Sequence, residues 1–212
     1  MEFTTKLKKE THSKHKVLDT HKFVKDISTS TGGYYLDLHN IILNELKLIL
    51  CNTRFEFPDY FNDFNKNYNK YELLTGNILY NSPALQMYMN KLHKDIFDQQ
   101  MLLSHMYIWW LGVLYGGQMI KKTICKNKGN PQDLEDYTNL EGYTNLEGYT
   151  NFIFDVENGK GFIKDFKMYL NETIIKQEEF IDNVNELYGL VNGIFDELTS
   201  RMPDELTSTL SS

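Results

Sequence analysis

Cysteine is scarce in this sequence of 212 residues. Only Cys51 and Cys125 occur, far apart and without the paired spacing of a zinc site. A disulfide framework and a structural zinc site are therefore not expected. The N-terminal stretch MEFTTKLKKETHSKHK is charged throughout and lacks the apolar core of a signal peptide. These features predict a soluble, cytoplasmic protein in a reducing compartment.

Arginine and positive charge are also in short supply. Arg54 and Arg201 are the two arginines, and the formal net charge is -7. An acidic chain is not expected to bind nucleic acid, because phosphate neutralisation needs a concentrated basic surface. Any anion site has to use lysine ammonium groups. The most apolar run, residues 106–120, is shorter than the roughly 20 residues that span a bilayer, so no membrane span is expected.

Strand-like alternation is scarce, whereas helical periodicity is common. The chain contains 14 Tyr and 13 Phe and is 41% hydrophobic, which predicts a well-packed domain. We predict an all-α single-domain protein over residues 1–198, followed by a polar C-terminal tail at 199–212. The clearest helix lies near the C-terminus, where apolar residues recur at steps of three and four: Phe180, Ile181, Val184, Leu187, Tyr188, Val191, Ile194, Phe195 and Leu198.

Three further helices are predicted from local signals. One runs over about 33–50, with the preceding segment STSTGG as a break. A second begins where Ser82 supplies an N-cap and Pro83 occupies the first turn. A third covers about 99–125. Residues 137–151, YTNLEGYTNLEGYTN, repeat a hexapeptide too short to build a stacked core, and we expect a surface loop there.

The first chemical candidate is a histidine cluster in the stretch THSKHKVLDTHKF. His12 and His15 are three residues apart, which on a helix gives a shared face, and His21 follows. Asp19 lies four residues after His15, where its carboxylate can orient the imidazole of a metal ligand. The alternative is that these histidines are ordinary exposed side chains, which is the commoner case.

The second candidate is WLGVLYGGQ at residues 110–118. Glycine costs a helix interior about 1 kcal/mol relative to alanine, so three glycines need a physical reason. Gly112 and Gly116 form a GxxxG pattern, which permits close helix packing. Alternatively, Gly112, Gly116 and Gly117 expose backbone to a flat ligand. The nearby aromatics fit either a cavity wall or a core; they are Tyr107, Trp109, Trp110 and Tyr115.

Taken together, three segments resemble the haem oxygenases over approximately residues 6–198. They are LKKETHSKH with Asp19 and KFVK after it, LLSHMYIWWLGVLYGGQMIKK, and FDEL near the end. The most specific part is WLGVLYGGQ, which is similar to the family signature YLGDLSGGQ. The resemblance implies an all-α helical bundle in which haem lies between a proximal and a distal helix.

The resemblance also implies roles for individual residues. His15 falls at the position of the iron ligand, and Asp19 corresponds to the acidic residue near it. Gly112 and Gly116 match the glycines that let the distal helix pass close to the haem face, and Tyr115 is a candidate hydroxyl on that side. The other residues expected to contact haem, including its propionates, are Lys8, Tyr107, Gly117, Lys160, Lys164 and Tyr188.

This sequence departs from the family pattern at four positions. Val113 replaces an aspartate that organises distal water for proton delivery, and an apolar side chain cannot do this. Trp109 stands where an arginine is frequent, Tyr115 replaces a serine, and Val191 replaces an asparagine. Plant members of the family also lack the aspartate. The departures predict a distal side that holds less water or has different hydrogen bonds.

The leading functional hypothesis is a haem oxygenase. It would cleave haem, its substrate and cofactor, with O2 and an external electron donor, a reductase or ferredoxin, to biliverdin, CO and Fe2+. The alternative is a haem-binding protein without oxygenase turnover, such as a carrier, a sensor or a degenerate homologue, which Val113 favours. A third hypothesis is a helical enzyme of similar architecture that binds no haem, of the thiamin-salvage type.

Overall fold

The computed structural model describes residues 2–27, 29–61, 79–116 and 156–201, and within these ranges it contains helices and no strand. The elements in order are α1 (Phe3–Asp19), α2 (Lys22–Lys25), α3 (Thr29–Asn52), the 3-10 turn η1 (Leu79–Asn81), α5 (Pro83–Asp95), α6 (Gln99–Leu111), the π-helical segment η2 (Gly112–Gly116), α9 (Val156–Thr173) and α10 (Gln177–Arg201). The prediction of an all-α protein is confirmed.

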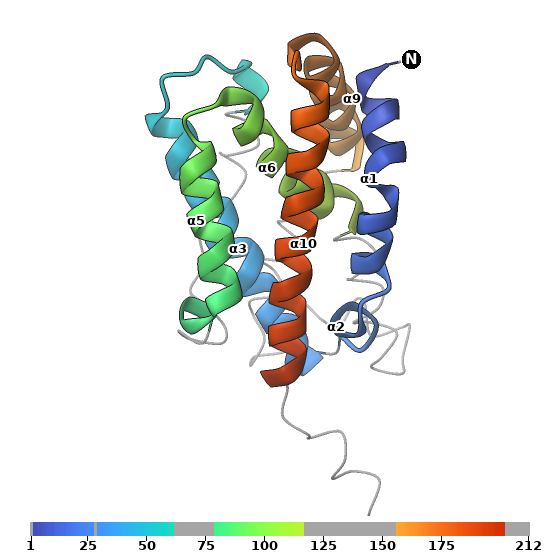
Figure 1. Ribbon diagram of the computed structural model, residues 1–212, viewed down its shortest axis with the longest axis vertical. Helices are drawn as coiled ribbons and strands as arrows, with labels where there is room; N and C mark the ends of the chain where they lie inside the picture. The colour runs from blue at the N-terminus through green and yellow to red at the C-terminus, as the bar shows by residue number, and fades with distance from the viewer. Residues whose placement is uncertain (1, 28, 62–78, 117–155, 202–212) are drawn as a thin grey trace, which may run out of the picture.

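Helix α10 is the centre of the bundle. It packs against α1, α2, α5 and α6, and Figure 1 shows it between α5 on one side and α1 on the other. All nine apolar residues of the predicted periodic stripe are buried. Their spacing places them on the faces that meet neighbouring helices, and this burial drives the packing.

Helix α1 packs along α10 through its apolar face. Phe3 and Phe180 meet edge to face with ring centroids 5.4 Å apart. Leu7 and Leu18 are also buried on this face. Beyond α1, His21 caps α2 by accepting a hydrogen bond from the Phe23 N–H through Nδ1, at 3.0 Å. The buried side chains of Phe3 and Leu18 therefore hold α1 near both of its ends.

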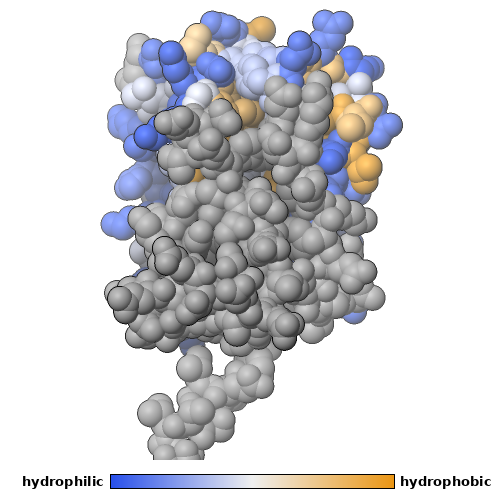
Figure 2. All heavy atoms as spheres, turned by 180° about the vertical axis from the view of Figure 1, so that it is seen from behind, coloured by the Kyte–Doolittle hydropathy of each residue, from blue (hydrophilic) through white to orange (hydrophobic). Residues whose placement is uncertain are grey.

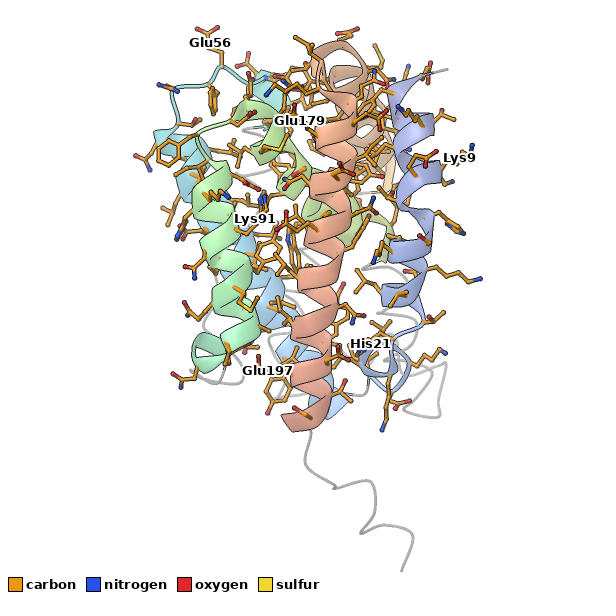
Figure 3. All side chains as sticks on the ribbon, in the orientation of Figure 1. Lys9, His21, Glu56, Lys91, Glu179 and Glu197 are labelled. Atoms are coloured by element: carbon orange, nitrogen blue, oxygen red, sulfur yellow. The ribbon has the colours of Figure 1, made fainter. Side chains whose placement is uncertain are left out.

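The predicted start of α5 is confirmed. Ser82 Oγ accepts a hydrogen bond from the Leu85 N–H at 3.0 Å, and Pro83 occupies the first turn. Glu197 of α10 accepts from Ser82 Oγ at 2.7 Å and from the Ala84 N–H at 3.0 Å. Figure 3 shows Glu197 on the side of α10 that faces α5. A carboxylate at this helix N-terminus links the two elements.

The predicted break at STSTGG is wrong, because α3 begins at Thr29 and includes Gly32 and Gly33. Glycine lowers helix propensity by about 1 kcal/mol per residue, an amount that tertiary packing readily outweighs. The turns that follow bury Tyr35, Leu38 and Ile42. Burial of this face accounts for the helix starting earlier than local propensity indicates.

Several sequence predictions fall outside the described residues. These are the repeat loop at 137–151, the residues 117–125 of the predicted long helix, and residues 202–212 of the tail. Among the helices that the structure does describe, none is both long and apolar enough to cross a membrane. Figure 2 shows the reverse side, where hydrophilic residues gather on the upper surface with hydrophobic residues among them.

Candidate functional site

His15 and Asp19 form a local pair on the exposed side of α1. The distance from His15 Nδ1 to Asp19 Oδ2 is 2.9 Å, and the two side chains are 49% and 52% exposed. The four-residue spacing predicted this contact. Because the carboxylate accepts the proton of Nδ1–H, the lone pair of the neutral ring is on Nε2. A metal ligand with a carboxylate partner has this arrangement.

Tyr188 of α10 packs against the His15 ring. The two ring centroids are 5.5 Å apart with an interplanar angle of 79°. Tyr188 is buried, and burial raises the pKa of its hydroxyl, with Tyr107 and Asp19 adding to the rise. The phenol therefore stays neutral and serves as a rigid wall beside the imidazole.

Tyr107 connects α6 to the same region. Its hydroxyl hydrogen-bonds Thr11, which lies one turn before His15 on α1. Thr11 Oγ also donates to the Leu7 carbonyl at 2.8 Å, within α1. Burial is the main cause that raises the pKa of Tyr107 to about 12. The structure thus brings together three predicted residues, His15, Tyr107 and Tyr188.

The glycine stretch begins where α6 changes its helical type. The α-helix ends at Leu111, and residues Gly112–Gly116 form a π-helical segment. π-Helical turns inside helices are rare and are frequently found at functional sites. Gly117 lies outside the described residues. The change of helical type therefore coincides with Gly112 and Gly116, the first two glycines of the stretch.

Close packing against another described helix does not account for Gly112 and Gly116. A Cβ atom built on either glycine meets no heavy atom of the described residues within 4 Å. Gly112 has φ -57° and ψ -46°, which any residue adopts. Among the described residues, neither a crowded helix contact nor backbone strain requires glycine at these positions.

Tyr115 and a lysine of α9 form a contact that the sequence analysis missed. Lys167 Nζ donates to Tyr115 Oη at 3.3 Å and lies 5.5 Å from the centre of its ring. Tyr115 is 52% exposed. Lys167 follows Lys160 and Lys164 at spacings of seven and three residues, which places all three lysines on one helix face. This spacing was the signal that could have identified Lys167.

The predicted propionate-binding lysines lie on the surface. Lys8, Lys160 and Lys164 are exposed, and none of the three pairs with an acidic group in the described ranges. Lys8 lies on α1 seven residues before His15, which is about two helical turns. Because the ammonium groups of these three lysines have no acidic partner in the described ranges, they are available to bind a carboxylate of a ligand.

Two buried polar atoms flank Tyr188 on α10. Asn185 Oδ1 and Asn192 Oδ1 lack a hydrogen-bond donor in the part of the chain that the structure describes. They lie three residues before and four residues after Tyr188, on the same face of the helix. A buried acceptor without a donor is costly, so this face of α10 offers two positions for a ligand or an ordered water.

The metal-binding side chains of this region fit a metal ion whose other ligands come from a macrocycle. Among the described residues, no three His, Cys, Asp or Glu side chains gather closely enough to hold a metal ion. Haem iron would need only one further ligand from the protein, and His15 Nε2 could supply it. The lack of a described atom within 4 Å of a Cβ on Gly112 or Gly116 and the unpaired acceptors beside Tyr188 also fit a flat ligand in this region.

Comparison with known proteins supports the fold. No family model matches the sequence, and no curated protein matches it in sequence. Among solved structures, the chain is similar to a crystal structure of haem oxygenase-1 from the cyanobacterium Synechocystis sp. PCC6803 in complex with haem. The TM-score is 0.68 at 18% sequence identity, and the match covers 100% of both chains. The chain therefore has the all-α fold of the haem oxygenases.

Proposed function

We propose that this protein is a haem oxygenase, which binds haem through His15 and cleaves it to biliverdin, CO and Fe2+. The observation that carries the proposal is the 2.9 Å contact between His15 Nδ1 and Asp19, which leaves Nε2 to bind iron. The likeness in fold to a haem oxygenase supports the assignment. O2 and an external electron donor, a reductase or ferredoxin, complete the reaction.

When bound, haem supplies the iron at which O2 is reduced, and its own ring is the substrate. His15 ligates the iron, and Asp19 orients the imidazole through Nδ1. Tyr188 restricts the tilt of this ring from the side. Gly112 and Gly116 leave room for the haem plane, because no side chain of the described residues lies within 4 Å of a Cβ built on either glycine. These five residues contribute to the reaction by positioning the haem.

Lysine side chains orient the haem by binding its propionates. Lys8 lies on α1, and Lys160, Lys164 and Lys167 form one face of α9. An ammonium group paired with a carboxylate anchors that edge and thereby fixes the rotation of the ring about its axis. Tyr115 stands next to Lys167 and supplies the hydroxyl group that Val113 lacks.

The test begins with a haemin titration of the purified protein. We expect a Soret band whose intensity saturates at one haemin per chain. Adding a reductase or ferredoxin system under air should then replace this band with a bilin spectrum and release CO. A protein that gives no Soret shift contradicts the proposal and favours the helical enzyme without haem.

Two variants of α1 test the ligand assignment. His15→Ala should abolish the spectrum of a histidine-ligated haem and stop biliverdin formation. His12→Ala is the matched control, because His12 is also exposed and lies three residues away on the same helix. If His15→Ala and the parent have the same spectrum and turnover, His15 is not the ligand.

A second candidate function is haem binding without turnover, and Val113 is the residue that favours it. The valine side chain cannot hold or donate a proton, which oxygen activation requires. If the parent binds haem but forms no biliverdin, Val113→Asp should restore product formation. Val113→Asn separates proton delivery from polarity, because its amide binds water but does not titrate. Turnover by the parent rules out this candidate.

A further inference from the structure

A chain of buried hydrogen bonds leads to the last turn of α6 before Gly112–Gly116, which we call the glycine segment. The chain lies outside the residues already assigned to the site. Trp109 Nε1 donates to Tyr88 Oη at 2.6 Å. Tyr88 Oη is 2.7 Å from His105 Nδ1, and His105 Nε2 is 3.0 Å from Asp95 Oδ2. Tyr88, His105 and Trp109 are each at most 3% exposed. The chain joins α5 to two successive turns of α6.

The chemistry of the end groups fixes the direction of these hydrogen bonds. The indole N–H of Trp109 can only donate, so Tyr88 Oη accepts from it and donates its own proton to His105 Nδ1. His105 then donates from Nε2–H to the Asp95 carboxylate. Burial raises the pKa of Tyr88 and lowers the pKa of His105, so both groups stay neutral in this arrangement.

An ion pair anchors the far end of the chain. Lys91 Nζ lies 2.8 and 2.6 Å from the two carboxylate oxygens of Asp95, and Asn183 of α10 donates to the same group at 3.1 Å. Burial raises the pKa of Asp95, but hydrogen bonds from His105, Lys91 and Asn183 outweigh it and hold the pKa at about 2. Figure 3 shows Lys91 pointing from α5 toward α10.

The other end of the chain lies next to the glycine segment. Trp109 precedes Gly112 by three residues, so it occupies the last α-helical turn before η2. Its indole ring stands between two edge-to-face neighbours, Tyr88 at 5.7 Å and His39 at 4.9 Å. The rings come from α5 and α3. Trp109 is therefore held by side chains of two other helices at the point where α6 changes its geometry.

We propose that Tyr88, His105 and Asp95 are positioning residues of the haem site, which hold Trp109 and thereby fix where the glycine segment leaves α6. This inference rests on the proposed haem site. The three residues act through Trp109 and do not touch haem themselves.

The test compares the same substitution at opposite ends of α6. Tyr88→Phe keeps the ring and removes the hydroxyl that Trp109 donates to. Tyr169→Phe is the matched control, because its hydroxyl accepts a hydrogen bond from Gln99 at the first turn of α6, at 3.1 Å. Two quantities are measured on each variant: amide hydrogen exchange over residues 109–116 without haem, and the haemin dissociation constant from the Soret titration.

For Tyr88→Phe we expect exchange over residues 109–116 to become about tenfold faster and the haemin dissociation constant to rise by about tenfold. Tyr169→Phe should change neither by more than about twofold. A double variant separates positioning from general loss of stability: in a Trp109→Phe background, which has no indole N–H, Tyr88→Phe should add less than about twofold.

The outcomes separate this inference from the proposed function. If the parent binds no haemin but Tyr88→Phe still accelerates exchange over residues 109–116, the haem proposal fails and the positioning role of the chain stands. If the parent binds haemin and Tyr88→Phe changes neither quantity, the positioning role fails. It also fails if Tyr88→Phe lowers the melting temperature alone, or if its effects persist in full with Trp109→Phe.

Discussion

The two helices that would enclose haem are held in place in different ways. On α1, His15 and Asp19 form a contact between neighbours on one helix, and both side chains are about half exposed. On α6, Trp109 is buried and its support comes from α5, with the supporting Asp95 also held from α10. One side is assembled locally and faces solvent, whereas the other is assembled from distant parts of the chain.

Asp19 and Asp95 both contact a histidine, but this difference means that they contribute differently to stability. An exposed pair such as His15–Asp19 contributes about 0 to 1 kcal/mol to stability, so its arrangement serves orientation. Asp95 carries a charge inside the bundle and meets Lys91, His105 and Asn183. Removing one member of a buried charged group leaves its partners without compensation. Stability should therefore depend on Asp95 far more than on Asp19.

The largest expected effect is the loss of stability in Asp95→Ala. We expect the free energy of unfolding to fall by about 3–5 kcal/mol, because Lys91 and His105 lose their buried partner. Asp19→Ala, its counterpart on α1, should cost less than about 1 kcal/mol. Urea denaturation followed by circular dichroism measures both. Equal losses in the two variants would contradict the contrast between the two helices.

The second effect is a loss of stability in acid, which comes from the buried His39 beside Trp109. Burial lowers the pKa of His39 to about 4, whereas an unfolded histidine titrates near 6.5. Between these values the unfolded state binds more protons, so the free energy of unfolding falls as pH falls from 6.5 to 4 and levels off below that range. One such histidine contributes on the order of 3 kcal/mol to this change.

Urea denaturation at pH 7 and pH 4.5 tests this dependence. His39→Gln should lose less stability between the two pH values than the parent, because the amide does not titrate. Some slope should remain, since burial also lowers the pKa of His105. His12→Gln is the control, because it makes the same substitution at an exposed position of α1. An identical slope in His39→Gln and the parent would refute the assignment.

The same contrast explains which features the sequence could predict. The His15–Asp19 contact follows from a spacing of four residues on one helix. The start of α5 at Ser82 and the apolar face of α10 are equally local patterns, and all three predictions agree with the structure. Such features depend on residues within a few turns of one another, so periodicity and capping rules are sufficient.

The support of Trp109 could not be predicted in this way. Tyr88 and Trp109 are 21 residues apart, and Asn183 and Asp95 are 88 apart. No periodic pattern relates such positions, because only the packing of separate helices brings them together. The error at STSTGG has a related cause: local propensity favoured a break, whereas burial of residues such as Leu38 decided the start of α3.

The third effect concerns haem affinity rather than stability. Asp19→Ala should weaken haemin binding about 10- to 100-fold, because the imidazole loses the carboxylate that orients its Nδ1–H. Asp19→Asn keeps an acceptor oxygen and should retain most of the affinity. The Soret titration measures both variants. A parent-like affinity in Asp19→Ala would mean that the Asp19 carboxylate does not orient His15 for haem binding.

The smallest effect on stability is expected at Gly112, and its sign is opposite to the others. Gly112→Ala should raise the free energy of unfolding of the haem-free protein by about 0.4–1 kcal/mol, because the backbone is helical and the new methyl group meets no described atom. The same methyl group would occupy the space proposed for haem, so haemin affinity should fall.

Gly193→Ala on α10 is the matched control for this variant. A Cβ at Gly193 also meets no described atom within 4 Å. Gly193 lies two turns after Glu186, so both residues lie on the same side of α10. Glu186 approaches Lys91 of α5 on this side, which faces away from His15. This variant should be stabilised to a similar extent without losing haemin affinity. Because both substitutions add one methyl group that meets no described atom, equal haemin affinities in the two variants would show that haem does not approach Gly112.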